Sequence, residues 1–395
     1  MSTEVLPSGS DVADADLFSD ETLDDPYPLY RAIRDAGPVV HSNRHHLWMV
    51  SRHADVRDVL KDWRSYSSAG GTAVEDSVNE LRAGNIISTD PPDHDHLRDV
   101  LSTQMSAREI RKLQSGVEER AHAMVAALVR NGGGDVVTGL AQPLPLGVVA
   151  DLVGFPDEGR EGLLEWVDAS FNTFGPLNAR ARSSVPKLEG IWSWLSTMAT
   201  RERLRPGGLG AAIHDAKDRG DITPEQCQSL LFAYATAGID TTVNAVSSAV
   251  WLLARHPEQW EVLRSDPGLV PGALNEVLRL ESPIQAFTRR TTAPREIGGV
   301  AVPPGARVLV LFGSANRDER RWEEPEQFDV RRKAVDQVAF GYGVHSCAGQ
   351  FLARVEGHAV LSALVAQVRR LRLVTAERKL NNVLRGFASV QVEMA

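Results

Sequence analysis

The sequence predicts a mainly α-helical protein with a minor β portion, built around one long central helix. Between about residues 92 and 205, apolar residues recur with the 3.6-residue period of amphipathic helices. Glycines and prolines interrupt this period and predict short turns between helices, at residues 132–134, Pro143, Pro145, Pro156, Pro176, Pro186 and Pro206. Residues 226–254 contain a single charged residue, Asp240, among many hydroxyl and amide side chains. That mixture predicts a helix that lines a cavity inside a soluble protein rather than a membrane span.

The first elements after the N-terminus are a helix and a small sheet. Residues 28–36 have a helical pattern, and residues 38–51 alternate in the manner of strands, with Val39, Trp48 and Val50 expected to face inward. Residues 1–20 are acidic and rich in Ser and Ala, without the basic start and apolar stretch of a signal peptide. We therefore expect a flexible tail over residues 1–20 and a single domain over residues 21–395.

The central helix has a well-marked start. Thr223 is a capping residue, Pro224 occupies the first helical position, and Glu225 adds an acid to the first turn. The helical pattern then continues to about His256. These features predict one continuous helix of more than about 30 residues.

The last part of the chain returns to strands and then to a helix. Residues 292–311 have β character around a turn at residues 302–305. A further helix is expected from just after Cys347 toward Arg372.

Composition excludes several classes of protein. The formal net charge is −9, with acidic and basic residues interspersed, so no broad basic field attracts nucleic acid or anionic lipid. The two cysteines, Cys227 and Cys347, have no paired spacing, which predicts a reducing compartment rather than a disulfide framework or a zinc cluster. We expect a cytoplasmic monomer that binds neither nucleic acid nor membrane.

The most informative stretch is residues 340–349, Phe-Gly-Tyr-Gly-Val-His-Ser-Cys-Ala-Gly, between a polar loop and a predicted helix. Gly343 and Gly349 permit a tight loop with unusual dihedral angles, whose backbone amides can point at the Cys347 sulfur. The start of the next helix adds a positive dipole end that favours a thiolate. An isolated cysteine is more often a small buried apolar residue, and only its neighbours favour a ligand here.

This stretch resembles the haem-binding signature of cytochromes P450, which reads Phe, two residues, Gly, then His or Arg two residues before Cys, and Gly two residues after it. Phe340, Gly343, His345, Cys347 and Gly349 match every position. The resemblance implies the cytochrome P450 fold, with haem b between the long central helix and the Cys-bearing loop. It makes Cys347 the axial iron ligand, places His345 at a haem propionate, and packs Phe340 beside the sulfur.

A second motif, Ala-Gly-Ile-Asp-Thr-Thr, occupies residues 237–242 inside the predicted central helix. A helical Gly costs about 1 kcal/mol relative to Ala, and an acid facing a core is also unfavourable. Taken alone, the motif is better interpreted as a solvated Asp beside a Thr whose hydroxyl forms a hydrogen bond to the preceding helical turn. Together with the Cys347 loop it resembles the P450 oxygen-activation motif, which implies that O2 sits against a locally widened helix while Asp240 and Thr241 direct protons.

A third motif is Glu276 and Arg279, three residues apart on one predicted helix face. As an exposed ion pair, this spacing is common and contributes less than about 1 kcal/mol. It resembles the P450 Glu-x-x-Arg pair, which a downstream Arg completes, and Arg332 is the expected third member. The resemblance implies a charge-assisted brace behind the thiolate loop.

Three further residues match P450 positions that bind the haem propionates. His94 and Arg98 are four residues apart and share a helix face, and Arg289 lies in a later segment. Each alone is an ordinary exposed charge, but all three occur in family order.

Nearly the whole chain is similar to soluble bacterial P450s, and in particular to the branch that O-demethylates methoxy-substituted aromatics, including para-methoxybenzoate. The stretches that carry this resemblance are residues 171–176, 206–208, 313–318, 381–382 and 384–386. The branch implies a small apolar slot for a flat aromatic substrate, although plain core packing is an alternative reading of its aromatics. The residues expected to line it are Phe171, Phe174, Phe287, Ala233 and Ala237.

The charge of the substrate stays open. Benzoate-oxidising members carry an Arg-Ser pair where this chain has Phe232 and Ala233, which favours a neutral methoxyphenol such as guaiacol or syringol. Arg82 and Asn85 match other carboxylate-contacting positions, so para-methoxybenzoate remains the alternative substrate.

The implied reaction uses O2 and two electrons to hydroxylate the methyl group of an aryl ether, which then releases a phenol and formaldehyde. The sequence has no flavin or iron–sulfur motif, so the electrons are expected from NAD(P)H through separate redox proteins, a ferredoxin and a ferredoxin reductase. An acidic ferredoxin is expected to dock near basic residues on the thiolate side, namely Arg98, Arg108, Arg111, Lys112 and Arg354.

Other functions remain as alternatives. They are hydroxylation of another small apolar substrate, a peroxide-using or isomerising haem enzyme, and a non-catalytic haem-binding protein. The intact pair of Asp240 and Thr241 counts against the peroxide-using enzyme, which often lacks such a pair.

Overall fold

The structure is a computed structural model that describes residues 9–395, and most of these residues are helical. The helices of the first half are α1 (Gly9–Asp14), α2 (Asp20–Asp24), α3 (Tyr27–Ala36), α4 (His53–Lys61), α5 (Asp76–Leu81), α6 (Asp93–Ser102), α7 (Ala107–Arg130), α8 (Pro143–Val153), α9 (Leu163–Asn172) and α10 (Ala179–Met198). Those of the second half are α11 (Leu209–Asp218), α12 (Pro224–Ala237), α13 (Asp240–Arg255), α14 (Pro257–Ser265), α15 (Val270–Leu280), α16 (Phe312–Ala315) and α17 (Gln350–Gln367). Short 3₁₀ or π turns occur at Ile86–Ser88, Val137–Ala141, Arg160–Gly162, Pro267–Leu269 and Gly343–His345.

The strands form a minor portion of the molecule, as the sequence predicts. A five-stranded sheet has the order β1-β2-β8-β5-β3, with β2 and β8 parallel and the other neighbours antiparallel. Its strands are β1 (Val39–Ser42), β2 (Leu47–Val50), β3 (Tyr66–Ser67), β5 (Ala286–Thr291) and β8 (Arg307–Leu311). A second sheet joins β4 (Gly133–Asp135), β10 (Arg385–Met394) and β9 (Leu371–Leu380), and β6 (Arg295–Ile297) pairs with β7 (Val300–Val302).

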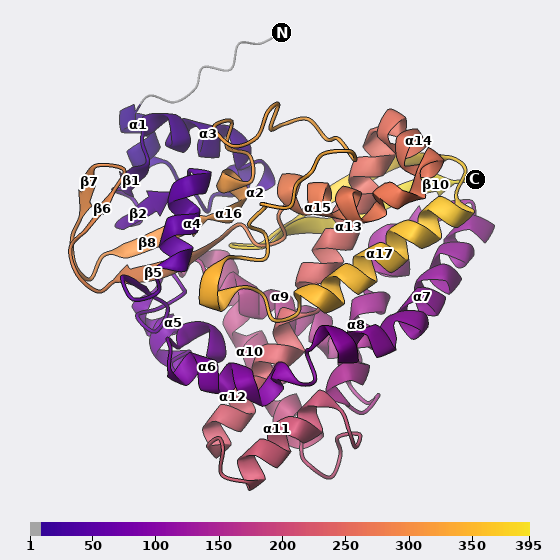
Figure 1. Cartoon of the computed structure of the whole chain (residues 1–395), viewed down its shortest axis with the longest axis horizontal. Helices are drawn as coiled ribbons and strands as arrows, with labels where there is room; N and C mark the ends of the chain where they lie inside the picture. The colour runs from indigo at the N-terminus through magenta and orange to yellow at the C-terminus, as the bar shows by residue number, and fades with distance from the viewer. Residues whose placement is uncertain (1–8) are drawn as a thin grey trace.

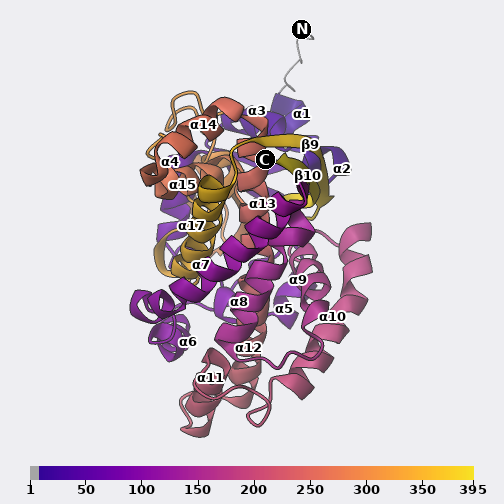
Figure 2. The ribbon, with the colours of Figure 1, turned by 90° about the vertical axis from the view of Figure 1, so that its right-hand side faces the viewer.

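Figure 1 shows β1, β2, β5 and β8 gathered on the left side of the molecule beside α1, α3 and α4, with most of the other helices to the right and below. Helix α17 lies along α7 and beside α13, an arrangement that both Figure 1 and Figure 2 show. The largest hydrophobic core includes buried residues of α7, α8, α12, α13 and α17. The Cys347 loop, which precedes α17, is therefore held next to the central helical region.

The start of the central helix matches the prediction, but its continuity does not. Thr223 forms a capping box with Gln226, because each side chain accepts a hydrogen bond from the backbone of the other. The helix is nevertheless interrupted at Gly238 and Ile239, which separate α12 from α13. At this break the Thr241 hydroxyl donates to the Ala237 carbonyl at 2.8 Å and replaces a missing backbone hydrogen bond.

Two smaller expectations are also corrected. The turn expected at Pro186 is absent, because α10 continues through this proline. Pro186 is exposed, so water can bind the carbonyl that the proline leaves unpaired. The flexible tail was expected over residues 1–20, but its second half is packed. Val12, Leu17 and Phe18 are buried in a core cluster. Residues 1–8 of that expectation lie outside the described residues.

Within residues 9–395, no helix combines the length and the apolar character that a bilayer span requires.

Candidate functional site

A cavity of about 270 Å³ lies between the break in the central helix and the Cys347 loop. Its lining comes from α6, α8, α9, α12, α13, α17 and β5, together with the loop that precedes α17. Most of the lining is apolar, and its polar groups are concentrated near the loop. This is the position at which the sequence predicts haem.

The Cys347 loop is a tight turn held by its own backbone. The Cys347 N–H donates to the Phe340 carbonyl at 2.8 Å, and both residues line the cavity. Burial raises the pKa of the Cys347 thiol, whereas a hydrogen bond from Gly349 and the charges of Arg98 and Arg354 lower it. Such a thiol ionises when it binds a metal ion, so the loop fits an iron ligand.

Of the two loop glycines, only Gly343 has the unusual dihedral angle that we predicted. Its φ is +75°, and a Cβ there would lie 2.6 Å from the Leu60 carbonyl oxygen of α4. Gly349 has an ordinary φ of −85°, so that prediction was wrong for it. Gly349 instead brings the N-terminus of α17 close to the sulfur, because its Cβ position lies 3.9 Å from Cys347 Sγ.

The four residues expected at the haem propionates come together at one end of the cavity. His94, Arg98, Arg289 and His345 all line it, and the His94 and His345 ring centroids are 4.3 Å apart. Arg98 donates to the Ser346 carbonyl at 3.1 Å. Donors from α6, β5 and the Cys347 loop therefore converge on one point.

The electrostatics of this end fit an anionic group. His345 Nε2 is buried and has no hydrogen-bond partner among the described residues, with Asp90 Oδ1 3.9 Å away. Burial lowers the pKa of His345, Asp90 opposes this, and the charges of Arg289 and His94 add to the lowering, so that the pKa is about 4. Burial also lowers the pKa of Arg289 to about 10. Two carboxylates at this end would pair with these donors and relieve their mutual repulsion.

Asp240 and Thr241 lie at the first turn of α13, and this helix lines the same cavity as Cys347. Thr241 lines the cavity, and Asp240 is 4% exposed with its Oδ2 unpartnered within the described part of the chain. Burial raises the pKa of Asp240 to about 7. A carboxyl that is partly protonated at neutral pH is suited to proton transfer.

The expected aromatic slot forms only in part. Phe171, Phe287, Ala233 and Ala237 line the cavity. Phe174 does not line it but lies behind Phe287, with ring centroids 5.0 Å apart. The slot is therefore made by four of the five expected residues.

The expected carboxylate contacts also lie outside the lining. The Arg82 guanidinium sits over the Phe174 ring at 4.0 Å and donates to the Ser170 carbonyl and to the Thr173 hydroxyl. Asn85 is buried, and its side chain accepts from the Ile87 N–H and caps a short 3₁₀ turn. Local hydrogen bonds therefore hold both side chains away from the cavity.

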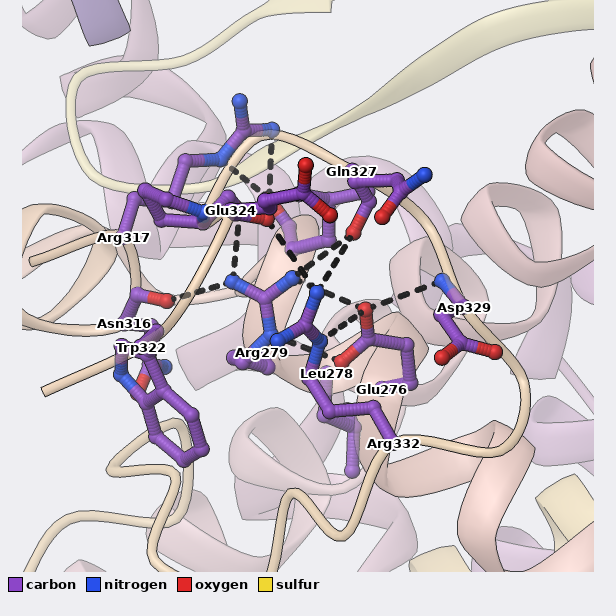
Figure 3. A network of polar contacts seen from close by, with 12 residues as sticks. Glu276, Leu278, Arg279, Asn316, Arg317, Trp322, Glu324, Gln327, Asp329 and Arg332 are labelled. Carbon is purple, nitrogen blue, oxygen red and sulfur yellow. Dashed lines mark hydrogen bonds and ion pairs between the residues drawn. The ribbon is translucent and has the colours of Figure 1, made fainter. Parts of the chain in front are cut away.

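The three charged residues of the predicted brace meet as expected (Figure 3). Arg279 Nε is 2.7 Å from Glu276 Oε2, and Arg332 Nε is 3.0 Å from Glu276 Oε1. Glu276 and Arg279 are fully buried, and Arg279 also donates to the carbonyls of Asn316 and Pro325. The brace ties α15 to the long loop that leads to Cys347.

The basic residues expected to receive a ferredoxin divide into two groups. Arg108, Arg111 and Lys112 are exposed at the start of α7. Arg98 is engaged with Ser346, and Arg354 donates to Asn275 at 2.7 Å. The α7 group is therefore the more exposed part of the expected docking surface, and its Lys112 pairs with Glu109 at 2.6 Å.

Three polar residues on helices of the cavity wall were given no role in the sequence prediction. Tyr234, Thr242 and Glu356 line it, and Glu356 Oε1 is buried without a partner among the described residues. Burial alone raises the pKa of Glu356 to about 8. Each lies within a helix, and the sequence of these helices does not indicate which face borders the cavity. Only Thr242 could have been suggested, because it follows Asp240 and Thr241 directly.

Comparison with known proteins gives a consistent result. The cytochrome P450 family model matches residues 268–388. Cytochrome P450 CYP199A2 of Rhodopseudomonas palustris is 39% identical over 384 residues, covering 96% of this chain and 93% of that protein. The cytochrome P450 monooxygenase PikC of Streptomyces venezuelae is 31% identical, covering 96% and 94%. The solved structure of cytochrome P450 CREJ in complex with (4-ethylphenyl) dihydrogen phosphate has a TM-score of 0.87 and 27% identity, covering 94% and 98%.

Members of this family bind haem b, use O2 and receive electrons from NAD(P)H through redox partners. The cysteine loop, the donors at one end of the cavity and the acid–alcohol pair on α13 fit that cofactor. The sequence similarity spans almost the full length of both chains. The chain therefore belongs to the cytochrome P450 family and is a haem-dependent monooxygenase.

Proposed function

We propose that the enzyme O-demethylates a small neutral methoxy-substituted aromatic, such as guaiacol or syringol, to a phenol and formaldehyde. One observation carries the proposal. The aromatic part of the cavity is lined by Phe171, Phe287, Ala233 and Ala237, while the cationic residues of the described lining gather at the propionate end. A flat apolar ring suits such a slot, and an uncompensated carboxylate does not.

Phe232 supports a neutral substrate in a second way. It is 5% exposed and does not line the cavity, because its ring stacks on Trp192 of α10 with centroids 4.6 Å apart. The residue at this position therefore packs α12 against α10, and the neighbouring Ala233 presents only a methyl group to the cavity. Neither residue offers a hydrogen bond to a carboxylate.

In this proposal, haem bound at Cys347 supplies the oxidant that places one atom of O2 into a C–H bond of the substrate methoxy group. The hydroxylated methoxy carbon is a hemiacetal, which breaks its bond to the aryl oxygen and leaves as formaldehyde. Two electrons, two protons and O2 are consumed for each phenol, formaldehyde and water produced.

The chain's own residues position the substrate and supply the protons. Phe171 and Phe287 hold the ring, and the small side chains of Ala233 and Ala237 leave room for the methoxy group. Asp240 delivers protons through the Thr241 hydroxyl, whose bond to the Ala237 carbonyl fixes its position at the cavity wall. The apolar lining excludes bulk water from the same space.

A specific observation favours para-methoxybenzoate as the second candidate substrate. Arg82 is paired only with neutral acceptors among the described residues, and burial lowers its pKa to about 10. The Phe174 ring contacts both this guanidinium, at 4.0 Å, and the Phe287 ring of the slot, with centroids 5.0 Å apart. A substrate carboxylate beside this guanidinium would find a desolvated charge partner.

A binding screen separates the two candidates. Guaiacol, syringol and 4-methoxybenzoate are added to the haem-bound protein, and the shift of the haem spin state is followed. We expect the two phenols to produce the larger shift and to release formaldehyde in proportion to electrons consumed. A shift produced by 4-methoxybenzoate alone, and lost in Arg82→Met, would replace this proposal with the carboxylate substrate.

A Thr241→Ala variant tests the oxygen chemistry itself. We expect it to consume electrons and O2 while yielding less phenol, because proton delivery loses its positioned hydroxyl. Unchanged coupling of electrons to product would favour a peroxide-using enzyme instead. Substrate-dependent O2 consumption by the unmodified protein would exclude a non-catalytic haem carrier.

A further inference from the structure

Three charged side chains from separate elements influence one another electrostatically near the break in the central helix. They are Asp240 at the start of α13, Asp168 on α9 and Lys379 on β9. Lys379 Nζ lies 3.1 Å from Asp168 Oδ1, and the Asn381 side-chain amide donates to the same oxygen at 3.0 Å. One carboxylate is therefore well satisfied while Asp240 Oδ2 has no hydrogen-bond partner among the described residues.

The strand that carries Lys379 passes directly beside the Asp240 turn. Lys379 pairs in register with Gly386 of β10, and Gly386 lies so close to the Asn244 side chain that no Cβ would fit there. Asn244 is one turn along α13 from Asp240. The strand pair that carries Lys379 therefore packs against α13 one turn from Asp240, while the Lys379 ammonium pairs with Asp168.

The electrostatics agree with this geometry. Burial raises the pKa of Asp240, the Lys379 ammonium opposes this and the Asp168 carboxylate adds to it, so that the pKa is about 7. Burial lowers the pKa of Lys379, but Asp240 and Asp168 together raise it above its ordinary value. Both acids thus compete for one ammonium group, and these are the charged groups that act on Asp240.

The competition is connected to the substrate slot. Asp168 and Phe171 are three residues apart on α9, and Phe171 lines the cavity. A substrate that contacts the Phe171 ring therefore acts within one helical turn of Asp168. The Lys379 side chain is 38% exposed, so its ammonium is in contact with solvent.

We propose that Lys379 is a positioning residue that exchanges between Asp168 and Asp240, and that substrate contact with Phe171 moves it toward Asp240. With the ammonium near Asp240, the carboxyl group becomes the stronger acid and releases its proton toward Thr241, and solvent restores that proton. Without substrate, Asp168 holds the ammonium and Asp240 keeps its proton. Asp240 therefore delivers its proton when a substrate occupies the slot and retains it when the slot is empty. This inference rests on the proposed function only in requiring an aromatic substrate in the slot.

The protonation of Asp240 is the direct test. In the ferric haem-bound protein, the infrared carbonyl band of protonated Asp240, identified by its loss in Asp240→Asn, is titrated against pH with and without guaiacol. We expect guaiacol to weaken proton binding to Asp240 about tenfold, which is one pKa unit. Lys379→Met should strengthen proton binding to Asp240, and Asp168→Asn should weaken it. In both variants, guaiacol should no longer change the Asp240 titration.

Matched controls separate the exchange of Lys379 between Asp168 and Asp240 from general effects of charge. Lys187 pairs with Glu165 of α9 at 2.9 Å on the surface, so Glu165→Gln and Lys187→Met should leave the Asp240 titration unchanged. Lys379→Arg retains the charge and should keep the response to guaiacol. Without guaiacol, Lys379→Met and Asp168→Asn should shift the pKa of Asp240 in opposite directions, whichever aromatic the enzyme oxidises. A failed demethylation assay therefore does not affect this test. Equal titrations in Lys379→Met, Asp168→Asn and the controls would overturn the proposal.

Discussion

Glu276 and Arg279 are both fully buried, and their charged groups meet at 2.7 Å. A buried ion pair is stable only when further hydrogen bonds satisfy its remaining atoms. Arg332, the Asp329 N–H and the carbonyls of Asn316 and Pro325 supply them here. Because these partners belong to the loop that leads to Cys347, the pair links the stability of α15 to the shape of the thiolate loop.

Removing one charge from this pair should be costly. Glu276→Gln leaves the Arg279 guanidinium buried without a counter-charge, and we expect the free energy of unfolding to fall by about 3–5 kcal/mol. The exposed pair of Arg264 and Glu261 has the same i, i+3 spacing, and Glu261→Gln should cost less than about 1 kcal/mol. Denaturant unfolding of the two variants makes the comparison, and equal losses would contradict a structural role for the brace.

The two cysteines should differ completely in the haem spectrum. Cys347→Ser replaces the expected thiolate with a hydroxyl, so we expect the reduced carbon-monoxide complex to lose its red-shifted Soret band. Cys227 is 2% exposed within α12 and does not line the cavity, so Cys227→Ser should keep the band. Persistence of the band in Cys347→Ser would show that the iron has a different axial ligand.

Glu356 should make the protein less stable as pH rises. Burial raises the pKa of Glu356 to about 8 from an ordinary value of 4.5, so the folded state binds this proton more tightly than the unfolded state does. Its contribution to stability is complete below pH 4.5 and is lost as pH rises toward 8, by up to roughly 5 kcal/mol. Glu356→Gln should flatten this dependence in thermal unfolding of the haem-bound protein. The exposed Glu119→Gln is the control, and an identical pH dependence in both variants would contradict the prediction.

Charge reversal on α7 tests the electron-donor surface. Arg111 and Lys112 are exposed at the start of this helix, and we expect Arg111→Glu with Lys112→Glu to slow reduction by an acidic ferredoxin about tenfold or more at low salt. The effect should shrink as ionic strength rises. Reversal of Arg182 and Lys187 on α10 is the matched control. A reduction rate and salt dependence that match the unmodified protein would place the docking surface elsewhere.

Features carried by neighbouring residues could be predicted from the sequence. The Phe340 to Gly349 loop, the capped start at Thr223 and the Asp240–Thr241 pair all depend on residues within one or two turns of each other. Local backbone geometry decides such features, because glycine, proline and capping residues act on their own segment. The family and the cofactor followed from these motifs.

Features that depend on distant packing were decided only by the tertiary structure. The break at Gly238 and Ile239 occurs where α8 packs against the helix, since a Cβ on Gly238 would lie 3.0 Å from Val149. The contact of Arg82 with Phe174 removes both from the slot, and Lys379 reaches the Asp240 region from more than a hundred residues away. The direction of a side chain depends on the shape and charge of neighbours that are remote in sequence. The sequence by itself therefore determined which chemistry this protein performs, and the fold decided which side chains surround it.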